Sequence, residues 1–407
     1  MASGQDPRNP LPAPPHASHL ATLHDHLAWW GLKRFTSDTH YFEWQRQCLS
    51  PSELTDLYHL IERKRTGSSA DETAFYDATA SRRVLPVLYS QRYEYYVEVG
   101  SRVTARIDPA RTILDFGCGV GILTTYYASQ YPDCTFIGLD RSRGSIERAR
   151  EQAAALGLNN VRFEWLDIAQ MDVPGTYDLI IATHALVQAE QDPGIPSRSW
   201  ETFERDHNEY QQRDFEARTG IGLRLDRLTM ALVSQGRMVV FEKTRQLARR
   251  VPFQRALASR GLSLIERPEP IRYQQVEDVS DDGPFYVLEK NSRMRVEWDE
   301  LPEPDEAAPF DLSAIAILPK GADEPPYENH HPSAQRVWEG LHERVVLTET
   351  TRAESDGRQM HVELGRAAEG RYLYCANTFD QRQLIIVDPA HSAMIESYYS
   401  EIVGGAS

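Results

Sequence analysis

Between residues 112 and 290, short apolar runs alternate with stretches whose apolar positions recur at helical spacing. The runs are typical of buried strands and are predicted at Thr112–Phe116, Thr135–Leu139, Val161–Leu166, Tyr177–Thr183, Met238–Glu242, Leu262–Ile265 and Phe285–Leu288. Helices are predicted between them at Gly121–Gln130, Ser145–Leu156, Leu223–Ser234 and Pro252–Arg260. Strands separated by single helices indicate a doubly wound, Rossmann-like α/β fold with a mostly parallel seven-stranded sheet. No long helix separates the last two strands, which allows one antiparallel strand at the end.

The residues before this alternation are predicted to form a helical N-terminal extension over 19–110. Ser50 and Pro51 are typical of a helix start, with a capping residue before a proline at the first helical position. A second helix is predicted from Ser90 to Ile107, because its apolar side chains recur on one face. Residues 1–18 are rich in proline and poor in large apolar groups, so we expect disorder there.

The pattern changes again beyond residue 295. Residues 296–310 form an acidic, proline-containing linker. After it, the sequence predicts a strand at Leu312–Leu318, a helix at Ser333–Arg344, strands at Val345–Thr351, Met360–Leu364, Tyr372–Ala376 and Leu384–Val387, and a closing helix at Ser392–Ile402. Turn residues separate successive strands, as in an antiparallel meander. We therefore predict a small α+β accessory domain over 311–407.

One connection within the α/β region is unusually long. Residues 191–222 separate the fourth predicted strand from its following helix, and long loops of this kind usually serve a function or lack order. Aromatic side chains are spaced through it, at Trp200, Phe203, Tyr210 and Phe215. We interpret it as an ordered insert or lid and expect its aromatics, with Arg205 and His207, to contact substrate. A helical decoration outside the fold is the alternative.

The first predicted strand runs into a loop with glycines at Gly117, Gly119 and Gly121. A dinucleotide-binding loop would need its third glycine at position 122, which is Ile122. Asp115 also places a carboxylate at the end of the strand, where a diphosphate would meet like charge. A ligand with a cationic or neutral group fits this loop better.

These residues resemble motif I of the class I S-adenosylmethionine-dependent methyltransferases. The resemblance rests on Leu114–Gly121, continues through Phe136–Asp140 and Glu164–Ile168, and reaches the strand Tyr177–Thr183. It implies S-adenosylmethionine as cofactor and S-adenosylhomocysteine as product. The residues implied to bind the cofactor are Asp115, Gly117, Cys118, Gly119, Gly121, Asp140, Arg141, Asp167, Ile168 and Thr183. Asp140 suits the ribose, because one carboxylate can accept hydrogen bonds from two hydroxyls.

Methyl transfer from a sulfonium is an in-line displacement that depends on positioning and on the exclusion of water. A general base assists when the acceptor must lose a proton. His184 follows the fourth strand directly, where the resemblance places the methyl group, and is the candidate catalytic residue. The alternative is a structural histidine packed beside the strand. Tyr76 and Tyr89 either point into the pocket or pack in the core.

Composition limits the classes of partner. The 407 residues carry a formal charge of −16, which argues against a broad nucleic-acid surface. Four cysteines are scattered without C-x-x-C spacing, and His19, His24 and His26 lack the i, i+4 spacing of paired ligands. We expect no metal, surface positions for these histidines and for His330 and His331, and a soluble cytoplasmic protein without a membrane segment.

Three functions remain open at this stage. The first is a methyltransferase acting on a small natural-product or metabolic acceptor. The second is a peptide or protein methyltransferase that recognises its substrate through residues 311–407. The third is a non-catalytic cofactor-binding scaffold. Assembly into a homo-oligomer through the C-terminal domain is a further open point.

Overall fold

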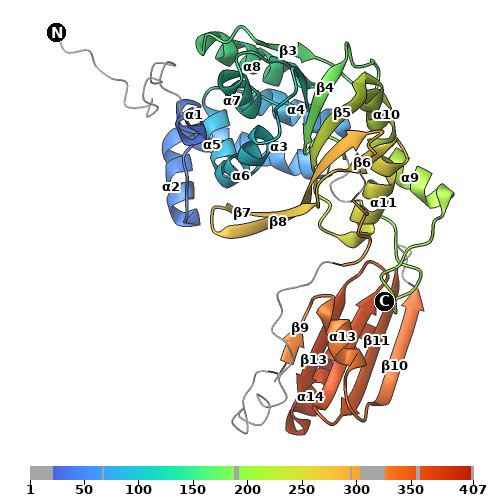
Figure 1. Ribbon diagram of the computed structural model, residues 1–407. Helices are drawn as coiled ribbons and strands as arrows, with labels where there is room; N and C mark the ends of the chain where they lie inside the picture. The colour runs from blue at the N-terminus through green and yellow to red at the C-terminus, as the bar shows by residue number, and fades with distance from the viewer. Residues whose placement is uncertain are drawn as a thin grey trace. The chain divides into compact units, whose positions relative to one another are not determined.

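The computed structural model describes residues 22–66, 68–187, 192–293, 296–302, 325, 327–353 and 358–404 (Figure 1). The predicted disorder of residues 1–18 and the predicted strand Leu312–Leu318 lie outside these residues, as does most of the linker. The chain divides into two units. Unit 1 comprises residues 1–190, 216–245 and 255–297, and unit 2 comprises 191–215, 246–254 and 298–407.

In the part of the chain that the structure describes, six helices precede the first strand and confirm the helical N-terminal extension. They are α1 (Leu23–Trp29), α2 (Asp38–Cys48), α3 (Pro51–Thr66), α4 (Ser69–Thr79), α5 (Val84–Ser90) and α6 (Tyr93–Thr104). Thr22 and Ser68 each begin a helix with a capping box, in which the side chain accepts from a backbone N–H three residues on. The predicted start of α3 at Pro51 is also confirmed.

The sheet of unit 1 contains the seven predicted strands and one more. Its path is β3 (Val161–Trp165), β2 (Thr135–Asp140), β1 (Thr112–Phe116), β4 (Tyr177–Thr183), β5 (Leu232–Phe241), β8 (Asp278–Lys290) and β6 (Leu262–Leu264). The first five strands are parallel, and β8 runs antiparallel to β5 and β6. The Rossmann-like, mostly parallel sheet is thereby confirmed. The additional strand, β7 (Glu269–Gln275), forms a hairpin with β8.

Apolar side chains of the central strands form the core of unit 1. Ile113 and Leu114 of β1 are fully buried, as are Leu179 and Ile180 of β4 and Met238 of β5. Strands covered on both faces need such unbroken apolar runs. The in-register pairing of β1 with β2 and β4 brings the carboxyl ends of these strands to one edge of the sheet.

Among the described residues, five helices follow the strands of unit 1 or lie at its boundary. They are α7 (Ile122–Gln130), α8 (Arg143–Ala155), α9 (Glu209–Thr219), α10 (Ile221–Ala231) and α11 (Leu247–Ala258). α7 starts directly after the glycine loop, so its N-terminus faces the edge where β1 ends. The boundary between the two units falls inside α9 and α11.

The antiparallel meander predicted for the C-terminal domain is confirmed in unit 2. Its sheet has the order β10 (Val345–Ala353), β11 (Gln359–Ala367), β12 (Gly370–Asn377), β13 (Arg382–Val387) and β9 (Tyr327–Asn329). Two helices, α13 (Ser333–Glu339) and α14 (Ser392–Gly404), belong to the same domain. α13 packs against Tyr372 and Tyr374, and α14 packs against Leu373. Since successive strand residues point to opposite faces, the two helices cover opposite faces of this sheet.

The long connection after β4 belongs largely to unit 2. Trp200 stacks face to face on His361 of β11, with ring centroids 3.7 Å apart, and meets Trp338 edge-on. Arg205 is buried and forms an ion pair with Asp380. The first part of the insert therefore packs within the C-terminal domain, and Trp200 and Arg205 have their contacts there.

Candidate cofactor site

The glycine loop between β1 and α7 has a backbone conformation that favours glycine. Gly117, Gly119 and Gly121 all have positive φ angles, of 74°, 54° and 81°. A Cβ atom on Gly117 would lie 2.4 Å from the Cβ atom of Ala185. The loop is tied to β2, because the N–H groups of Gly117 and Cys118 both donate to the carbonyl of Leu139. The loop therefore passes closely between β2 and the residues that follow β4.

Asp140 is fixed at the end of β2 by two backbone hydrogen bonds. One carboxylate oxygen accepts from Gly119 N at 2.9 Å and the other from Ser142 N at 2.8 Å. Burial raises the pKa of Asp140, and these two bonds oppose the rise. Each carboxylate oxygen keeps a second acceptor position for a ligand hydroxyl. The arrangement fits the ribose-binding role that the sequence predicts.

Asp115, at the end of β1, is buried beneath the loop. Thr124 of α7 donates its hydroxyl to Asp115 Oδ2 at 2.5 Å. Burial is the main cause that raises the pKa of Asp115 to about 7, with a smaller contribution from the charge of Asp140. Its carboxyl group is therefore near its midpoint at neutral pH, and a cationic ligand group beside it would favour the charged form.

Arg141 and Asp167 line the adjoining part of the cavity. Arg141 forms an ion pair with Glu72 of α4, and its carbonyl accepts from the indole N–H of Trp165 at 2.8 Å. Asp167 accepts from Ala169 N at 3.0 Å and from the Gln170 side chain at 2.9 Å. Asp167 thus stabilises its own turn while it borders the cavity.

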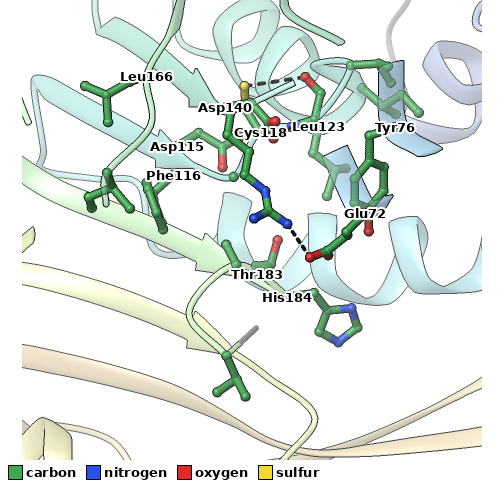
Figure 2. A pocket seen from close by; sticks show the side chains of 18 of the residues that line it. Glu72, Tyr76, Asp115, Phe116, Cys118, Leu123, Asp140, Leu166, Thr183 and His184 are labelled. Carbon is green, nitrogen blue, oxygen red and sulfur yellow. Dashed lines mark hydrogen bonds and ion pairs between the residues drawn. The ribbon is translucent and has the colours of Figure 1, made fainter. Parts of the chain in front are cut away.

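A single cavity collects the predicted cofactor residues (Figure 2). Every one of them lines it except Gly121, whose neighbours Val120 and Ile122 do so instead. The helical extension supplies one wall, with Glu72, Tyr76, Tyr89, Arg92, Tyr95 and Tyr96. Figure 2 shows His184 next to Thr183 and apart from Asp140 and Cys118. The cavity therefore runs from the predicted ribose end to the end of β4.

His184 lies at the β4 end of the cavity in a strained conformation. Its φ angle is 53°, and its N–H donates to the carbonyl of Phe241 at 2.8 Å. The imidazole packs against both Tyr95 and Phe241, with ring centroids 5.0 and 5.1 Å away, and these two rings also contact each other at 6.2 Å. Burial lowers the pKa of His184 to about 4, against the opposing effect of Asp282. The ring is therefore neutral at pH 7.

The two ring nitrogens of His184 have different neighbours. Arg92 donates to Nδ1 at 2.6 Å, which places the proton of the neutral ring on Nε2. Nε2 lies 3.2 Å from Asp282 Oδ2, although without hydrogen-bond geometry. With its basic nitrogen engaged by Arg92, His184 is arranged to orient that guanidinium.

Arg92 is a cation at the wall of the cavity that the sequence did not single out. Its guanidinium donates to His184 and lies 4.1 Å from the ring centroid of Tyr95. No carboxylate of the described residues lies within ion-pair distance of it. A guanidinium is always charged and binds carboxylates in bidentate geometry. Arg92 can therefore hold an anionic ligand group inside the cavity.

Sequence reasoning placed Tyr76 and Tyr89 correctly among the alternatives for the cavity wall but overlooked Tyr95 and Tyr96. The spacing of Tyr96 with Val99 and Val103 identified a buried helix face, and nothing in that pattern separates a core tyrosine from one that also borders a cavity.

The predicted surface position of His26 is wrong. His26 is fully buried, because α1 packs it against Trp30 and α7, where Nε2 lies 2.8 Å from the carbonyl of Ile122.

The described helices include none that is long and apolar enough to cross a membrane.

Comparisons with known proteins locate one recognisable domain: residues 107–220 match the family model of a methyltransferase domain. A 35% identical relative, over 82 residues, is the (S)-tetrahydroprotoberberine N-methyltransferase of Eschscholzia californica; the match covers 20% of this chain and 23% of the relative. The trans-aconitate 2-methyltransferase of Deinococcus radiodurans is 34% identical over 93 residues, covering 23% and 34%.

Among solved structures, magnesium protoporphyrin IX methyltransferase from Synechocystis PCC 6803 with bound S-adenosylmethionine is 17% identical, with a TM-score of 0.36. The match covers 56% of this chain and 95% of that one. Of the two curated relatives named above, the chain spans only 23% and 34% of their length. Residues 107–220 match a methyltransferase domain, and they contain the motifs that resemble the class I S-adenosylmethionine-dependent methyltransferases. The resemblance seen in the glycine loop is thereby confirmed.

Proposed function

We propose that the protein is an enzyme that transfers a methyl group from S-adenosylmethionine to a small-molecule acceptor. One observation carries the proposal: the glycine loop, Asp140 and the end of β4 line the same cavity. The curated relatives act, by their names, on tetrahydroprotoberberine and on trans-aconitate. Both acceptors are small molecules.

The residues around the cavity fit the three parts of the cofactor. The half-buried, doubly anchored carboxylate of Asp140 suits the ribose hydroxyls. Arg92 is the half-buried cation suited to the carboxylate of the amino-acid end, and Asp115 supplies negative charge for its ammonium group. Leu166 and Ile168 offer apolar contact for the adenine ring. The donor set therefore matches a zwitterionic, nucleoside-containing ligand.

The bound cofactor supplies an electrophilic methyl group, and the chain supplies position and a dry site. Tyr89, Tyr95 and Tyr96 form an aromatic wall that excludes water from the β4 end. His184 holds Arg92 through Nδ1 and carries its proton on Nε2. In this arrangement His184 orients the ligand-binding guanidinium, and it can accept a proton from an acceptor only after Arg92 leaves Nδ1.

A small acceptor is favoured over a peptide by the origin of the cavity wall. Every described residue that lines the cavity belongs to unit 1, between Glu72 and Arg224. Enclosure by α4 to α6 suits an acceptor that enters the cavity as a whole. The peptide alternative assigns recognition to the C-terminal domain, and the scaffold alternative predicts binding without turnover.

The test uses S-adenosylmethionine with a tritiated methyl group, incubated with the full-length protein and a cell extract. We expect label in the low-molecular-mass fraction, and none with the Asp140→Ala variant. Asp133→Ala, at an exposed position beyond α7, is the matched control and should label normally. Label confined to the protein fraction would favour the peptide alternative, and cofactor binding without any labelled product would favour the scaffold.

A further inference from the structure

The C-terminal domain holds a group of potential metal ligands far along the chain from the methyltransferase motifs. Glu349 of β10 and His361 and Glu363 of β11 place one ligand atom each within 4.8 Å of the others. His361 and Glu363 are 2% and 3% exposed, while Glu349 is exposed. We propose that these three residues bind one divalent transition-metal ion of the zinc class.

The strand register explains why the three side chains share a face. Glu349 pairs directly with Glu363, and Thr351 pairs with His361, two residues along each strand. Residues two apart in a strand point to the same side of the sheet. Like charges placed directly opposite each other destabilise a pair of strands. A cation between Glu349 and Glu363 would turn this repulsion into attraction.

The imidazole of His361 is oriented as a metal ligand usually is. Its Nδ1 lies 2.7 Å from the hydroxyl of Thr351, and a proton on Nδ1 leaves a lone pair on Nε2. Nε2 is buried and has no hydrogen-bond partner among the described residues. It lies 3.6 Å from Glu363 Oε2, so the free nitrogen is directed at a carboxylate oxygen. With the proton on Nδ1, a cation between the Nε2 lone pair and this carboxylate oxygen would bind both; with the proton on Nε2, the ring would direct an N–H at Glu363 instead.

Glu363 is likewise held so that one oxygen remains for a ligand. Oε1 accepts from the indole N–H of Trp338 at 3.1 Å and from the hydroxyl of Tyr372 at 2.5 Å. These two donors fix the carboxylate and leave Oε2 facing His361. No donor of the described residues is recorded for Oε2, so this oxygen is available to a metal ion.

The separations suit a tetrahedral ion. Zinc binds imidazole nitrogen at about 2.0 Å and carboxylate oxygen at about 2.1 Å, so two tetrahedral ligand atoms lie about 3.4 Å apart. The 3.6 Å between His361 Nε2 and Glu363 Oε2 is close to that value. The exposed side chain of Glu349 can move the remaining distance. A donor set of one imidazole and two carboxylates favours zinc or manganese over calcium, which prefers oxygen alone.

The surroundings close the site on one side and leave it open on the other. Trp200 covers the His361 ring with an interplanar angle of 3°, and the ion would reach the site past Glu349. Arg344 is the nearest competing cation described; it stacks on Trp338 and donates to the Trp338 carbonyl, without an ion pair to either glutamate. Metal binding would therefore brace β10, β11 and the Trp200 segment together.

The test is titration of the full-length protein with zinc chloride after dialysis against EDTA, followed by calorimetry. We expect one ion per chain, and at least a tenfold loss of affinity in Glu349→Gln, which lies at the surface and should fold normally. Glu396→Gln, an exposed glutamate of α14, is the matched control and should bind as the wild type does. Cobalt should give the intense visible absorption of a tetrahedral site, and Glu349→Gln should abolish it.

Two results would overturn the proposal. One is the absence of equimolar zinc binding by the wild type. The other is zinc binding that Glu349→Gln and His361→Gln leave unchanged, which would place the ion elsewhere. Neither result bears on methyl transfer, since the three residues lie outside the cofactor cavity.

Discussion

Burial shifts the pKa values of Asp115 and His184 in opposite directions, because it disfavours the charged form of each side chain. The pKa of Asp115 rises to about 7 and that of His184 falls to about 4. Both groups border the cofactor cavity. Asp115 is mostly neutral below pH 7 and His184 is mostly neutral above pH 4, so both are neutral between these limits. The cavity without ligand is therefore poised to gain negative charge when a cationic ligand enters beside Asp115.

Asp115→Asn should change how stability depends on pH. The folded pKa of about 7 lies above the unfolded value of about 3.9, so the folded state binds the extra proton between these limits. The stability that Asp115 contributes is present below about pH 4 and is lost as pH rises towards 7. Urea unfolding without cofactor measures the free energy of unfolding. As pH rises through that window, the value for the variant should increase relative to the wild type by up to about 1.4 kcal/mol per pH unit. A constant difference between the two proteins would contradict the buried, protonated state.

His184→Gln should give the opposite dependence. The folded pKa of about 4 lies below the unfolded value of about 6.5, so the unfolded state binds the extra proton between these limits. The stability that His184 contributes is present above about pH 6.5 and is lost as pH falls towards 4. The variant should therefore lose less stability than the wild type on acidification. His40→Gln, at an exposed histidine of α2, is the control, and its stability should depend on pH as that of the wild type does.

His184→Gln also tests the orienting role proposed for this residue. Because His184 contacts Arg92 through Nδ1, we expect weaker cofactor binding together with lower turnover. A general base that touched only the acceptor would lower turnover and leave cofactor affinity unchanged. Calorimetry with S-adenosylhomocysteine, beside turnover with an identified acceptor, separates these outcomes.

Asp140→Asn should weaken cofactor binding by about 1.5–3 kcal/mol, since a charged acceptor of two hydroxyl hydrogen bonds is replaced. The amide can still accept from only one of Gly119 N and Ser142 N, so the loop also loses an anchor. Calorimetry with S-adenosylhomocysteine measures the change, and Asp133→Asn is the control. Unchanged affinity in the Asp140 variant would remove this residue from the site.

At the scale of the elements, sequence periodicity predicted most strands and helices of unit 1, because buried parallel strands are apolar on both faces. It missed β7, in which only Ile271 and Tyr273 are buried and the other side chains are exposed. β9 escaped notice because it has three residues. Where an element buries few side chains, its pattern carries little signal.

The candidate site was predictable only in part. The glycine loop, Asp140 and Asp167 follow strands in a known motif, so their positions could be transferred from the resemblance. Arg92 could not be found in this way, because its role depends on the packing of α6 beside the end of β4. The group of potential metal ligands in the C-terminal domain, Glu349, His361 and Glu363, likewise depends on the register of β10 against β11. Sequence spacing does not reveal that register.

Gly117→Ala tests the tight turn between β1 and α7. The new methyl group would need both a positive φ and a position 2.4 Å from Ala185 Cβ, so something in the loop must shift. We expect a loss of about 2–4 kcal/mol in stability, combining strain with overpacking. Gly157→Ala isolates the strain alone, since its φ is 68° and nothing lies within 4 Å of the added carbon. Denaturant unfolding should show the Gly157 variant losing only about 1 kcal/mol.

At the scale of the whole molecule, the two units are not consecutive along the chain. Residues 191–215 and 246–254 belong to unit 2, although they lie between segments of unit 1. Within unit 2, the first of these segments is fixed by Trp200 on His361 and by Arg205 on Asp380. The insert predicted as a lid thus has a defined place in the C-terminal domain, and a lid role stays a prediction.

Trp200→Ala tests how strongly this segment is attached. The loss of its stacking on His361 should cost about 2–3 kcal/mol, below the ~3–5 kcal/mol of a fully buried tryptophan because the ring is partly exposed. Tyr210→Ala, at a tyrosine that is 76% exposed, is the control and should be nearly neutral. Thermal unfolding measures both. Equal melting temperatures of wild type and Trp200→Ala would show that the stacking contributes little.

The interleaved order of the two units constrains how the protein emerges from the ribosome. Trp200 is synthesised 161 residues before its partner His361, and Arg205 is synthesised 175 residues before Asp380, a delay of roughly 8–35 s at about 5–20 residues per second. During that time the segment exposes an indole ring and an arginine destined to be buried. Chaperone capture of nascent chains is therefore expected to peak between these two lengths and to end when β12 and β13 are complete.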